Sequence, residues 1–472
     1  MNSKNRNIVI ALMVAMFLAA FEGTVVTTAM PTIAKSLKGF NLISFIFSAY
    51  LLTSAISTPI YGKLSDLYGR KKMLSIGILI FIFGSSLCGF SQNMFQLIIF
   101  RLIQGLGAGA ILTITYTIIG DTFSIEQRTK IQGWLSTVWG IASLIGPFLG
   151  GFLIDYLSWH WIFFINVPFG LLSIFLLNKN LTETLSNTKP KIDYLGALLL
   201  TISIVSVLFG VFLNNATLKI SCLFTLIISL VIFYFVENKA EDPLVPFSIF
   251  TRATIIANII AFLTSSILMG IEAYTPIYTQ NVLGFSPTIA GVIMGPMSIA
   301  WLLSSVILSK ALPKYGEKKV ILSALIILIS TSILLKFLSI SSSVIYLIII
   351  IFIMGFGFGF IFTVTTIMVQ SAVGYEQRGV STSTNALIRT LGQTIGVSIF
   401  GSIVNSSISK HFSKMGIDGI TSENIYSSAT SSLEIKNAFF TGVHNVYLTL
   451  IILTIASFII ATRLKKDKLN TQ

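Results

Sequence analysis

The stretch IVIALMVAMFLAAFEGTVVTTAM, residues Ile8–Met30, decides the fold of this chain. Among its 23 residues only Glu22 carries a charge. A helix needs about 20 mostly apolar residues to cross the ~30 Å hydrocarbon core of a bilayer. The stretch therefore predicts a membrane-crossing helix, and a carboxylate inside it is costly enough to indicate a function.

Thirteen more such stretches follow, in a chain of 472 residues that is 54% hydrophobic and only 10% charged. About 25% of the residues in a soluble domain are charged. The composition therefore excludes a soluble enzyme and predicts an all-α integral membrane protein. We expect fourteen transmembrane helices, at residues 8–30, 45–61, 73–90, 95–119, 131–154, 161–177, 195–213, 218–236, 255–278, 289–308, 320–338, 344–369, 382–403 and 446–461.

The net charge of +14 comes from short basic clusters between the apolar stretches. A nucleic-acid-binding protein would carry its basic residues as one stripe on a polar domain, so no nucleic-acid partner is expected. With both termini in the cytoplasm, 22 of the 31 Lys and Arg residues fall on the inner side, seven at or beyond the outer ends of the spans (Lys219 and Lys336 lie within three residues of such an end) and two deep within the spans. Because basic residues favour the cytoplasmic side, we expect a multi-pass plasma-membrane protein with cytoplasmic N- and C-termini.

An internal repeat divides the chain. Four landmarks recur 250 positions apart, namely Glu22 and Glu272, Gly105 and Gly355, the Glu-Gln-Arg triplets at 126–128 and 376–378, and Gly146 and Gly396. This repeat predicts an N-terminal six-helix bundle at 1–180, two inserted helices with their linkers at 181–253, and a C-terminal six-helix bundle at 254–472. Parallel repeats of this kind place a substrate site between the bundles, near the bilayer midplane.

Three motifs carry a resemblance to a known family. They are Gly62-Lys-Leu-Ser-Asp-Leu-Tyr-Gly-Arg-Lys-Lys72, Arg101-Leu-Ile-Gln-Gly105, and the segment from Gly140 to Gly151 that contains Gly146-Pro147. Together they resemble the signatures of the major facilitator superfamily, in its fourteen-helix drug:proton antiporter branch (the QacA/EmrB-like multidrug exporters). The resemblance covers nearly the whole chain. It implies two six-helix bundles plus two inserted helices, and proton-coupled export.

The resemblance also implies a set of conformational gating residues. In the family, the acid and the arginine of the loop motif latch the two halves together, which gives that role to Asp66 and Arg70. A basic loop that only sets topology is the alternative, and we favour it for Lys71 and Lys72. For the motif at Gly140–Gly151, here called the helix 5 motif because it lies in the fifth predicted helix, a plain packing face of small residues is an equal alternative. The full gating set is Gly62, Asp66, Gly69, Arg70, Gly146, Pro147, Gly150 and Gly151.

Four charged residues lie inside predicted spans, where charge is expensive and mostly functional: Glu22, Arg101, Glu272 and Arg389. Glu22 lies 14 residues after Ile8, roughly 21 Å above the inner face. Arg101 lies six residues into a descending helix, about 9 Å below the outer face, which is the same depth in a ~30 Å core. We expect the two to pair and Glu22 to couple transport to protons. The family resemblance gives Arg101 the same coupling role.

The second half offers a less defined set of candidates. Glu272 is a candidate for a second proton site or for a site that binds a cationic substrate. The alternative is a polar residue that is satisfied by its local contacts. Tyr274, Phe356 and Phe358 are candidates for lining an apolar substrate cavity, with tight glycine packing as the alternative reading of the Gly-Phe pattern. Arg389 lies about 10 Å above the inner face, too far from Glu272 for easy pairing, and is predicted to brace its helix.

We therefore expect a monomeric proton-coupled antiporter that exports amphipathic cationic or zwitterionic drugs, with protons, substrates and the lipid bilayer as partners. No enzyme activity, metal or cofactor is expected. The sequence lacks a GxxxxGK[ST] motif, so direct ATP coupling has no support, and its two cysteines show no metal-site spacing. One alternative is an exporter of a single physiological compound, such as a lipid precursor, amino acid or siderophore. The other is a non-transporting membrane sensor, against which the retained Glu22 and Arg101 argue.

Overall fold

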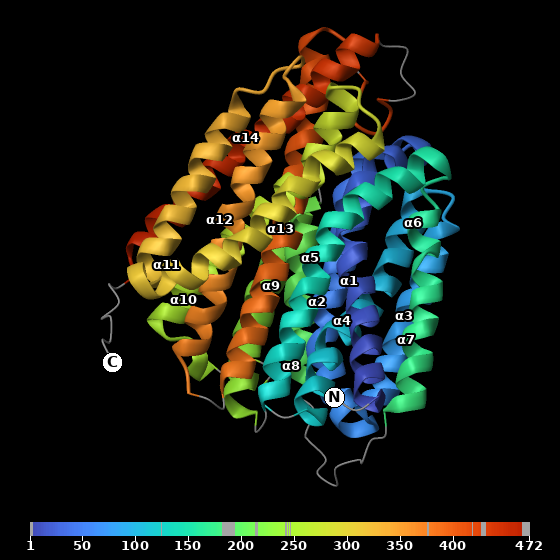
Figure 1. Cartoon of the computed structure of the whole chain (residues 1–472). Coiled ribbons are helices and arrows are strands. Elements are labelled where there is room, and N and C mark those ends of the chain that lie inside the picture. The colour runs from blue at the N-terminus through green and yellow to red at the C-terminus, as the bar shows by residue number, and fades with distance from the viewer. Residues whose placement is uncertain are drawn as a thin grey trace. The chain divides into compact units, whose positions relative to one another are not determined.

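The computed structural model describes residues 3–123, 125–181, 194–212, 216–240, 243, 245, 247–374, 377–417, 419–425 and 431–464, and every regular element in these ranges is a helix (Figure 1). Short helical turns occupy η1 (Phe40–Leu42), η2 (Phe247–Ile249) and η3 (Tyr278–Val282). The main helices are α1 (Ser3–Ser36), α2 (Ile43–Tyr68), α3 (Arg70–Gly89), α4 (Met94–Thr122), α5 (Ile125–Tyr156), α6 (Trp161–Phe164), α7 (Asn166–Asn180), α8 (Tyr194–Phe212), α9 (Ala216–Lys239), α10 (Arg252–Ile277), α11 (Pro287–Lys336), α12 (Val344–Ser371), α13 (Arg378–Lys414) and α14 (Ser432–Thr462).

Twelve helices within the described ranges are long and apolar enough to cross a membrane. One of them, α11, runs for 50 residues and spans two of the stretches that the sequence predicts as separate helices. Gly316, with φ 78° and ψ 165°, breaks α11 between those two stretches. Helix α8 is not among the twelve, because its apolar part within the described residues is Leu195–Val207.

The chain forms two compact units. The first holds residues 1–37 and 45–244, and the second holds 38–44 and 245–472. The short segment at 38–44 joins the second unit through its own contacts, because Phe40 packs edge-on against Phe439 and Asn405 Nδ2 donates to Asn41 O at 3.0 Å. Helices α8 and α9 belong to the first unit and pack chiefly on each other. The three-part domain division drawn from the repeat stays a prediction.

Small residues set the helix spacing in both units. A Cβ on Gly105 of α4 would lie 2.4 Å from the carbonyl oxygen of Tyr50 in α2. At the repeat position in the second unit, a Cβ on Gly355 of α12 would lie 2.3 Å from the carbonyl oxygen of Met297 in α11. Helices in lipid associate by such close backbone approach, because no hydrophobic force drives them together. The repeat therefore encodes the same helix packing twice.

The connection between α2 and α3 depends on one glycine conformation. Gly69 has φ 94° and ψ 140°, and its repeat counterpart Gly316 has φ 78° and ψ 165°. This region of backbone space is open essentially to glycine alone. The loop motif therefore needs glycine here for backbone reasons, whatever its neighbours do in gating.

Gly69→Ala should lower the free energy of unfolding by about 1–3 kcal/mol, because alanine is strained at this φ and ψ. The measurement is thermal unfolding of the purified protein in detergent. Gly120→Ala in α4 is the matched control, since nothing lies within 4 Å of a Cβ there and the backbone is helical. Equal melting temperatures for the two variants would contradict the prediction.

Candidate functional site

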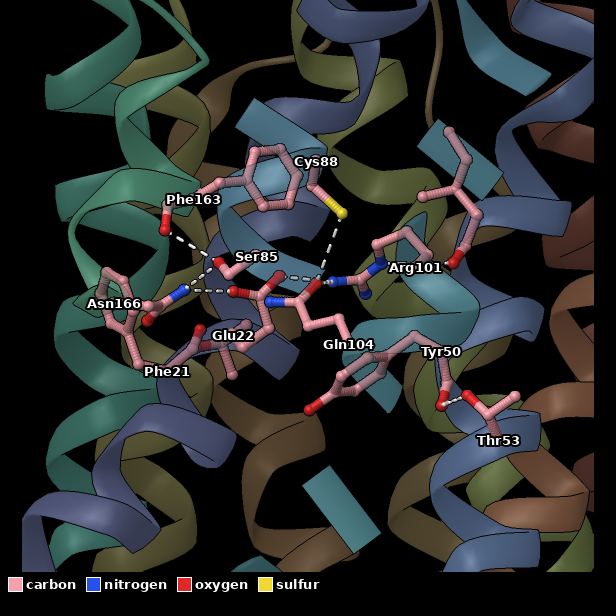
Figure 2. Close-up of polar contacts among 12 residues, drawn as sticks. Phe21, Glu22, Tyr50, Thr53, Ser85, Cys88, Arg101, Gln104, Phe163 and Asn166 are labelled. Atoms are coloured by element: carbon pink, nitrogen blue, oxygen red, sulfur yellow. Dashed lines mark hydrogen bonds and ion pairs between the residues drawn. The ribbon is translucent and has the colours of Figure 1, made fainter. Parts of the chain in front are cut away.

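The centre of the first unit is an ion pair between Glu22 of α1 and Arg101 of α4 (Figure 2). Arg101 Nη1 donates to Glu22 Oε1. The two residues are 1% and 0% exposed, respectively. The structure thus brings together the two charges that helix rise alone placed at one depth.

The second carboxylate oxygen of Glu22 is bound by an amide. Asn166 Nδ2, at the start of α7, donates to Glu22 Oε2 at 2.7 Å and to Ser85 Oγ of α3 at 3.0 Å. Ser85 in turn donates to the carbonyl oxygen of Phe163 at 2.8 Å. The carboxylate therefore ties α1 to α3, α4 and α7, as the dashed lines in Figure 2 show.

Arg101 has its own set of partners. The same Nη1 donates to Gln104 Oε1 at 2.9 Å, and the guanidinium carbon lies 4.2 Å from the ring centroid of Tyr50. Gln104 Oε1 also accepts from the thiol of Cys88 at 3.7 Å. A buried arginine surrounded by a carboxylate, an amide and an aromatic face is well compensated for its loss of water.

One polar atom beside the pair lacks a hydrogen bond within the described part of the chain. It is Asn166 Oδ1, a buried acceptor. Buried polar groups are nearly always satisfied in proteins, so this exception calls for an explanation. A free acceptor next to a carboxylate allows the hydrogen bonds to be rearranged when the carboxylate gains a proton.

Most of this network was not foreseen from the sequence. Gln104 stands inside the motif at Arg101–Gly105, but Asn166, Ser85, Tyr50 and Cys88 are not among the candidates from the sequence. A search for amides in apolar stretches would have flagged Asn166, because polar groups inside the membrane are costly. Nothing in the sequence indicates that Ser85 and Asn166 meet.

The glycines of α5 pack directly against α1 beside Glu22. A Cβ on Gly146 would lie 2.1 Å from Thr24 Oγ1, and one on Gly150 would lie 2.9 Å from the carbonyl oxygen of Val25. Thr24 Oγ1 donates to a backbone carbonyl of α5, that of residue 142, at 3.2 Å. Pro147 and Gly151 are buried on the same helix. The helix 5 motif thus contacts the turn of α1 that follows the buried carboxylate.

The loop motif makes contacts inside the first unit. Arg70 Nε donates to Asp121 Oδ2 of α4 at 2.8 Å, and Arg70 Nη1 donates to Ser65 Oγ at 2.9 Å. Asp121 was not a candidate from the sequence. Gly62 lies in α2, and a Cβ added there would be 3.6 Å from the methyl group of Thr113, which is an ordinary contact distance. The side chain of Asp66 lies outside the described residues.

The candidates of the second unit do not form one cluster. Glu272 is half-buried and has no hydrogen-bond or ion-pair partner among the described residues. Tyr274 is buried, and its hydroxyl donates to the carbonyl oxygen of Val397 in α13 at 3.3 Å. Phe358 is fully buried in α12, and Phe356 is half-buried and packs edge-on against a neighbouring phenylalanine at position 352.

Glu272 and Glu22 lie at different levels relative to their paired glycines. Gly146 contacts Thr24, two residues after Glu22, whereas Gly396 contacts Ser266, six residues before Glu272. The equal spacing in sequence predicts one level for both acids. The structure instead places Glu272 about 12 Å further along its helix, since eight residues of helix rise separate the two positions.

Residues 12–397 match the family model of the Major Facilitator Superfamily. Multidrug resistance protein 3 of Bacillus subtilis (strain 168) is 38% identical over 403 residues, covering 84% of this chain and 79% of that protein. Multidrug transporter protein MdtP of the same organism is 34% identical, covering 86% of this chain and 76% of that protein. Multidrug efflux pump SdrM of Staphylococcus aureus (strain N315) is 35% identical, covering 70% and 74%.

Solved structures resemble the chain over nearly its full length. A bacterial homologue of the human lysosomal transporter Spinster, in an inward-facing and unoccupied conformation, gives a TM-score of 0.70 at 14% identity and covers 98% of both chains. A D-xylose–proton symporter gives 0.67 at 14% identity and covers 100% of both. At such low identity the likeness shows the fold alone.

Removing one member of the buried pair should cost more than removing both. Glu22→Leu or Arg101→Met alone leaves an uncompensated buried charge and should lower the free energy of unfolding by about 3–5 kcal/mol. The double variant should lose less than either single variant, because it leaves no unpaired charge. Denaturation of all three variants in detergent micelles measures the coupling.

The pair of Arg70 and Asp121 provides the control for this cycle, because the Asp121 side chain is 54% exposed. Arg70→Gln and Asp121→Asn should each change stability by no more than about 1 kcal/mol. Additive effects of Glu22→Leu and Arg101→Met would show that the buried pair is not coupled.

Proposed function

Because this chain belongs to the major facilitator superfamily, we propose that it is a proton-coupled antiporter that exports amphipathic cationic or zwitterionic drugs. Relatives more than 30% identical over most of its length are named as multidrug transporters, which supports the drug-export part. The proton-coupling part rests on one observation, the buried ion pair of Glu22 and Arg101. The chain is a transporter and not an enzyme.

In the proposed mechanism, the two protonation states of Glu22 need different partners. The ionised carboxylate accepts hydrogen bonds from Arg101 and Asn166. A protonated carboxyl group must donate one, and its contact with Arg101 loses the charge attraction. Rotation of the Asn166 amide presents its free Oδ1 to that proton. A proton at Glu22 then biases the conformational equilibrium by binding one arrangement of the network better than the other.

The position of the α5 glycines supports a link between this site and the conformational change of transport. Gly146 and Gly150 contact α1 within the turn that follows Glu22, so a shift of α1 must move against α5. We assign gating to these residues together with Pro147 and Gly151. The loop motif, with Gly62, Asp66, Gly69 and Arg70, is assigned the latch, and the contact between Arg70 and Asp121 supports an ordered loop.

We also propose fourteen membrane crossings with both termini in the cytoplasm of a monomer at the plasma membrane. The break of α11 at Gly316 supports counting that helix as two crossings. Helix α8 has 19 residues over Tyr194–Phe212, which is long enough for a further crossing. The inner bias of the basic residues supports the orientation.

Glu22→Gln should abolish uphill transport. The variant mimics a permanently protonated carboxyl group, so substrate can still bind but the pH gradient no longer drives accumulation. In inverted membrane vesicles, uptake of a cationic dye should fall to the level seen after the pH gradient is collapsed. The pH dependence of dye binding should flatten.

Glu22→Asp is the matched control, because it keeps the carboxylate on a shorter side chain, and it should retain part of the activity. If Glu22→Gln vesicles accumulate dye like wild type and respond equally to collapse of the gradient, the coupling carboxylate lies elsewhere. Glu272 is then the next candidate.

Asn166→Leu removes both the donor and the acceptor that serve Glu22. Gradient-driven exchange should slow by about tenfold or more, since hydrogen bonds to charged groups are worth about 1.5–3 kcal/mol. Initial rates of dye uptake measure this. Ser173→Ala is the control, because it removes another buried hydrogen bond of α7, to the carbonyl oxygen of Ala11. Equal slowing in both variants would mean that Asn166 only stabilises α7.

A further inference from the structure

A polar cavity of about 190 Å³ lies between the last turns of α13 and the first half of α14. Two lysines and a histidine of α13 supply its basic groups, at positions 410, 414 and 411. Two serines, a threonine and an asparagine supply hydroxyl and amide groups, at positions 406, 407, 441 and 445. Among the described residues, no carboxylate lines it. The cavity therefore offers positive charge and hydrogen-bond donors to an anion.

The two lysines of the cavity have no acidic partner. Lys410 and Lys414 are exposed, and neither makes an ion pair or a hydrogen bond within the described ranges. Like charges four residues apart on a helix repel each other, and an anion between them would relieve that repulsion. The carboxylate of Glu434 is engaged by His411, whose Nε2 lies 3.5 Å from Glu434 Oε2. That acid serves the histidine and leaves the lysines uncompensated.

Hydrogen bonds and close packing fix the cavity floor, which is formed by Ser407 and Asn445. Asn445 Nδ2 donates to Ser407 Oγ at 2.9 Å, and Ser407 Oγ donates to the carbonyl oxygen of Ile403 at 2.7 Å. Beside the floor, a Cβ on Gly442 would lie 3.0 Å from Val404 Cγ1, so the two helices are in contact there. An amide nitrogen carries two donors, so the second N–H of Asn445 is available to a ligand.

The cavity lies at the depth of lipid headgroups. The predicted span of α13 ends at Ile403, and that of α14 begins at Val446. Ser407 is four residues, roughly 6 Å, beyond Ile403, and Lys410 is seven residues, roughly 10 Å, beyond it. The headgroup layer on each side of the hydrocarbon core is about 5–8 Å thick. Because helix side chains tilt toward the N-terminus of their helix, the lysines lean back toward this layer.

The cavity is separate from the charged and aromatic candidates of the second unit. Arg389 lies on the same helix but 21 residues, roughly 30 Å, before Lys410. Its guanidinium carbon lies 4.1 Å from the ring centroid of Phe362 in α12. Tyr274 contacts α13 at Val397, about 14 Å before Ser406. A ligand in the cavity would therefore occupy a place that none of these candidates describes.

We propose that this cavity binds the phosphate group of an anionic ligand, and its depth favours the headgroup of an anionic phospholipid as the source. Phosphate oxygens accept charge-assisted hydrogen bonds from ammonium groups, and basic pockets between transmembrane helices suit anionic headgroups. A zwitterionic headgroup brings its own cation, which the lysines repel. The bound headgroup would join α13 to α14. The proposal goes beyond the export function and does not rest on it.

The test measures binding of a short-chain phospholipid. Full-length protein in neutral detergent micelles is titrated with dihexanoyl phosphatidylglycerol, and the rise of the thermal unfolding midpoint gives an apparent Kd. Dihexanoylglycerol, which lacks the phosphate, should give no such rise. Lys410→Gln combined with Lys414→Gln should weaken phospholipid binding by about tenfold to a hundredfold. Asn445→Ala should weaken it by a smaller factor, because it removes one amide donor and keeps both lysines.

The matched control is Lys310→Gln combined with Lys314→Gln. These lysines are also exposed and four residues apart, on α11, and they do not line this cavity. The control should leave the Kd unchanged. Equal weakening by the two double variants would mean that the lipid only meets surface charge, and it would overturn the proposal. An unchanged Kd in the variant of Lys410 and Lys414, or in Asn445→Ala, would overturn it as well.

Inorganic phosphate distinguishes the two sources of the group. Tighter binding of phosphatidylglycerol than of inorganic phosphate, lost in the variant of Lys410 and Lys414, supports the lipid headgroup. Equally tight binding of inorganic phosphate, lost in the same variant, supports a phosphate site that is filled from solution. Wild-type protein that binds neither compound would contradict the proposal. The measurement needs no transport, so a failure of the proposed export function leaves it readable.

Discussion

The burial of one ion pair in a membrane protein is the constraint on which the first unit depends. Glu22 and Arg101 have lost nearly all contact with solvent, and the cost of removing two charges from water is several kcal/mol for each. Coulomb attraction offsets that cost only when the remaining donors and acceptors are also bound. Gln104, Asn166 and the ring of Tyr50 supply those contacts, Gln104 from α4 itself and the other two from α7 and α2. The pair and its partners therefore link four helices, α1, α2, α4 and α7.

Close backbone packing links the helix that holds Glu22 to the neighbouring helix α5. Helix α1 holds the carboxylate and, one turn later, accepts the glycines of α5 with no room for a side chain. Interfaces packed this tightly change between discrete arrangements and do not deform smoothly. A proton that changes the partners of Glu22 therefore acts on a contact that is either kept or rearranged. This is the physical basis for the proposed coupling.

The second unit repeats the glycine contacts of the first unit but differs in the partners of its charged residues. Gly355 packs α12 on α11 as Gly105 packs α4 on α2, yet Glu272 and Arg389 have no charged partner among the described residues. Paired charge in one unit and unpaired charge in the other fit a division of tasks. Under the proposed function, the first unit holds the coupling proton at its paired carboxylate.

The sequence by itself determined the membrane-spanning class, the duplicated framework and the common depth of Glu22 and Arg101. These follow from apolar run length, repeat spacing and the rise of a helix, which are local quantities. Only the tertiary structure decided that Asn166 and Ser85 complete the site and that Glu272 and Glu22 take different levels relative to the paired glycine of their own unit. Those facts depend on how far each helix rotates and slides against its neighbours, and that is set by side-chain packing between segments far apart in the chain.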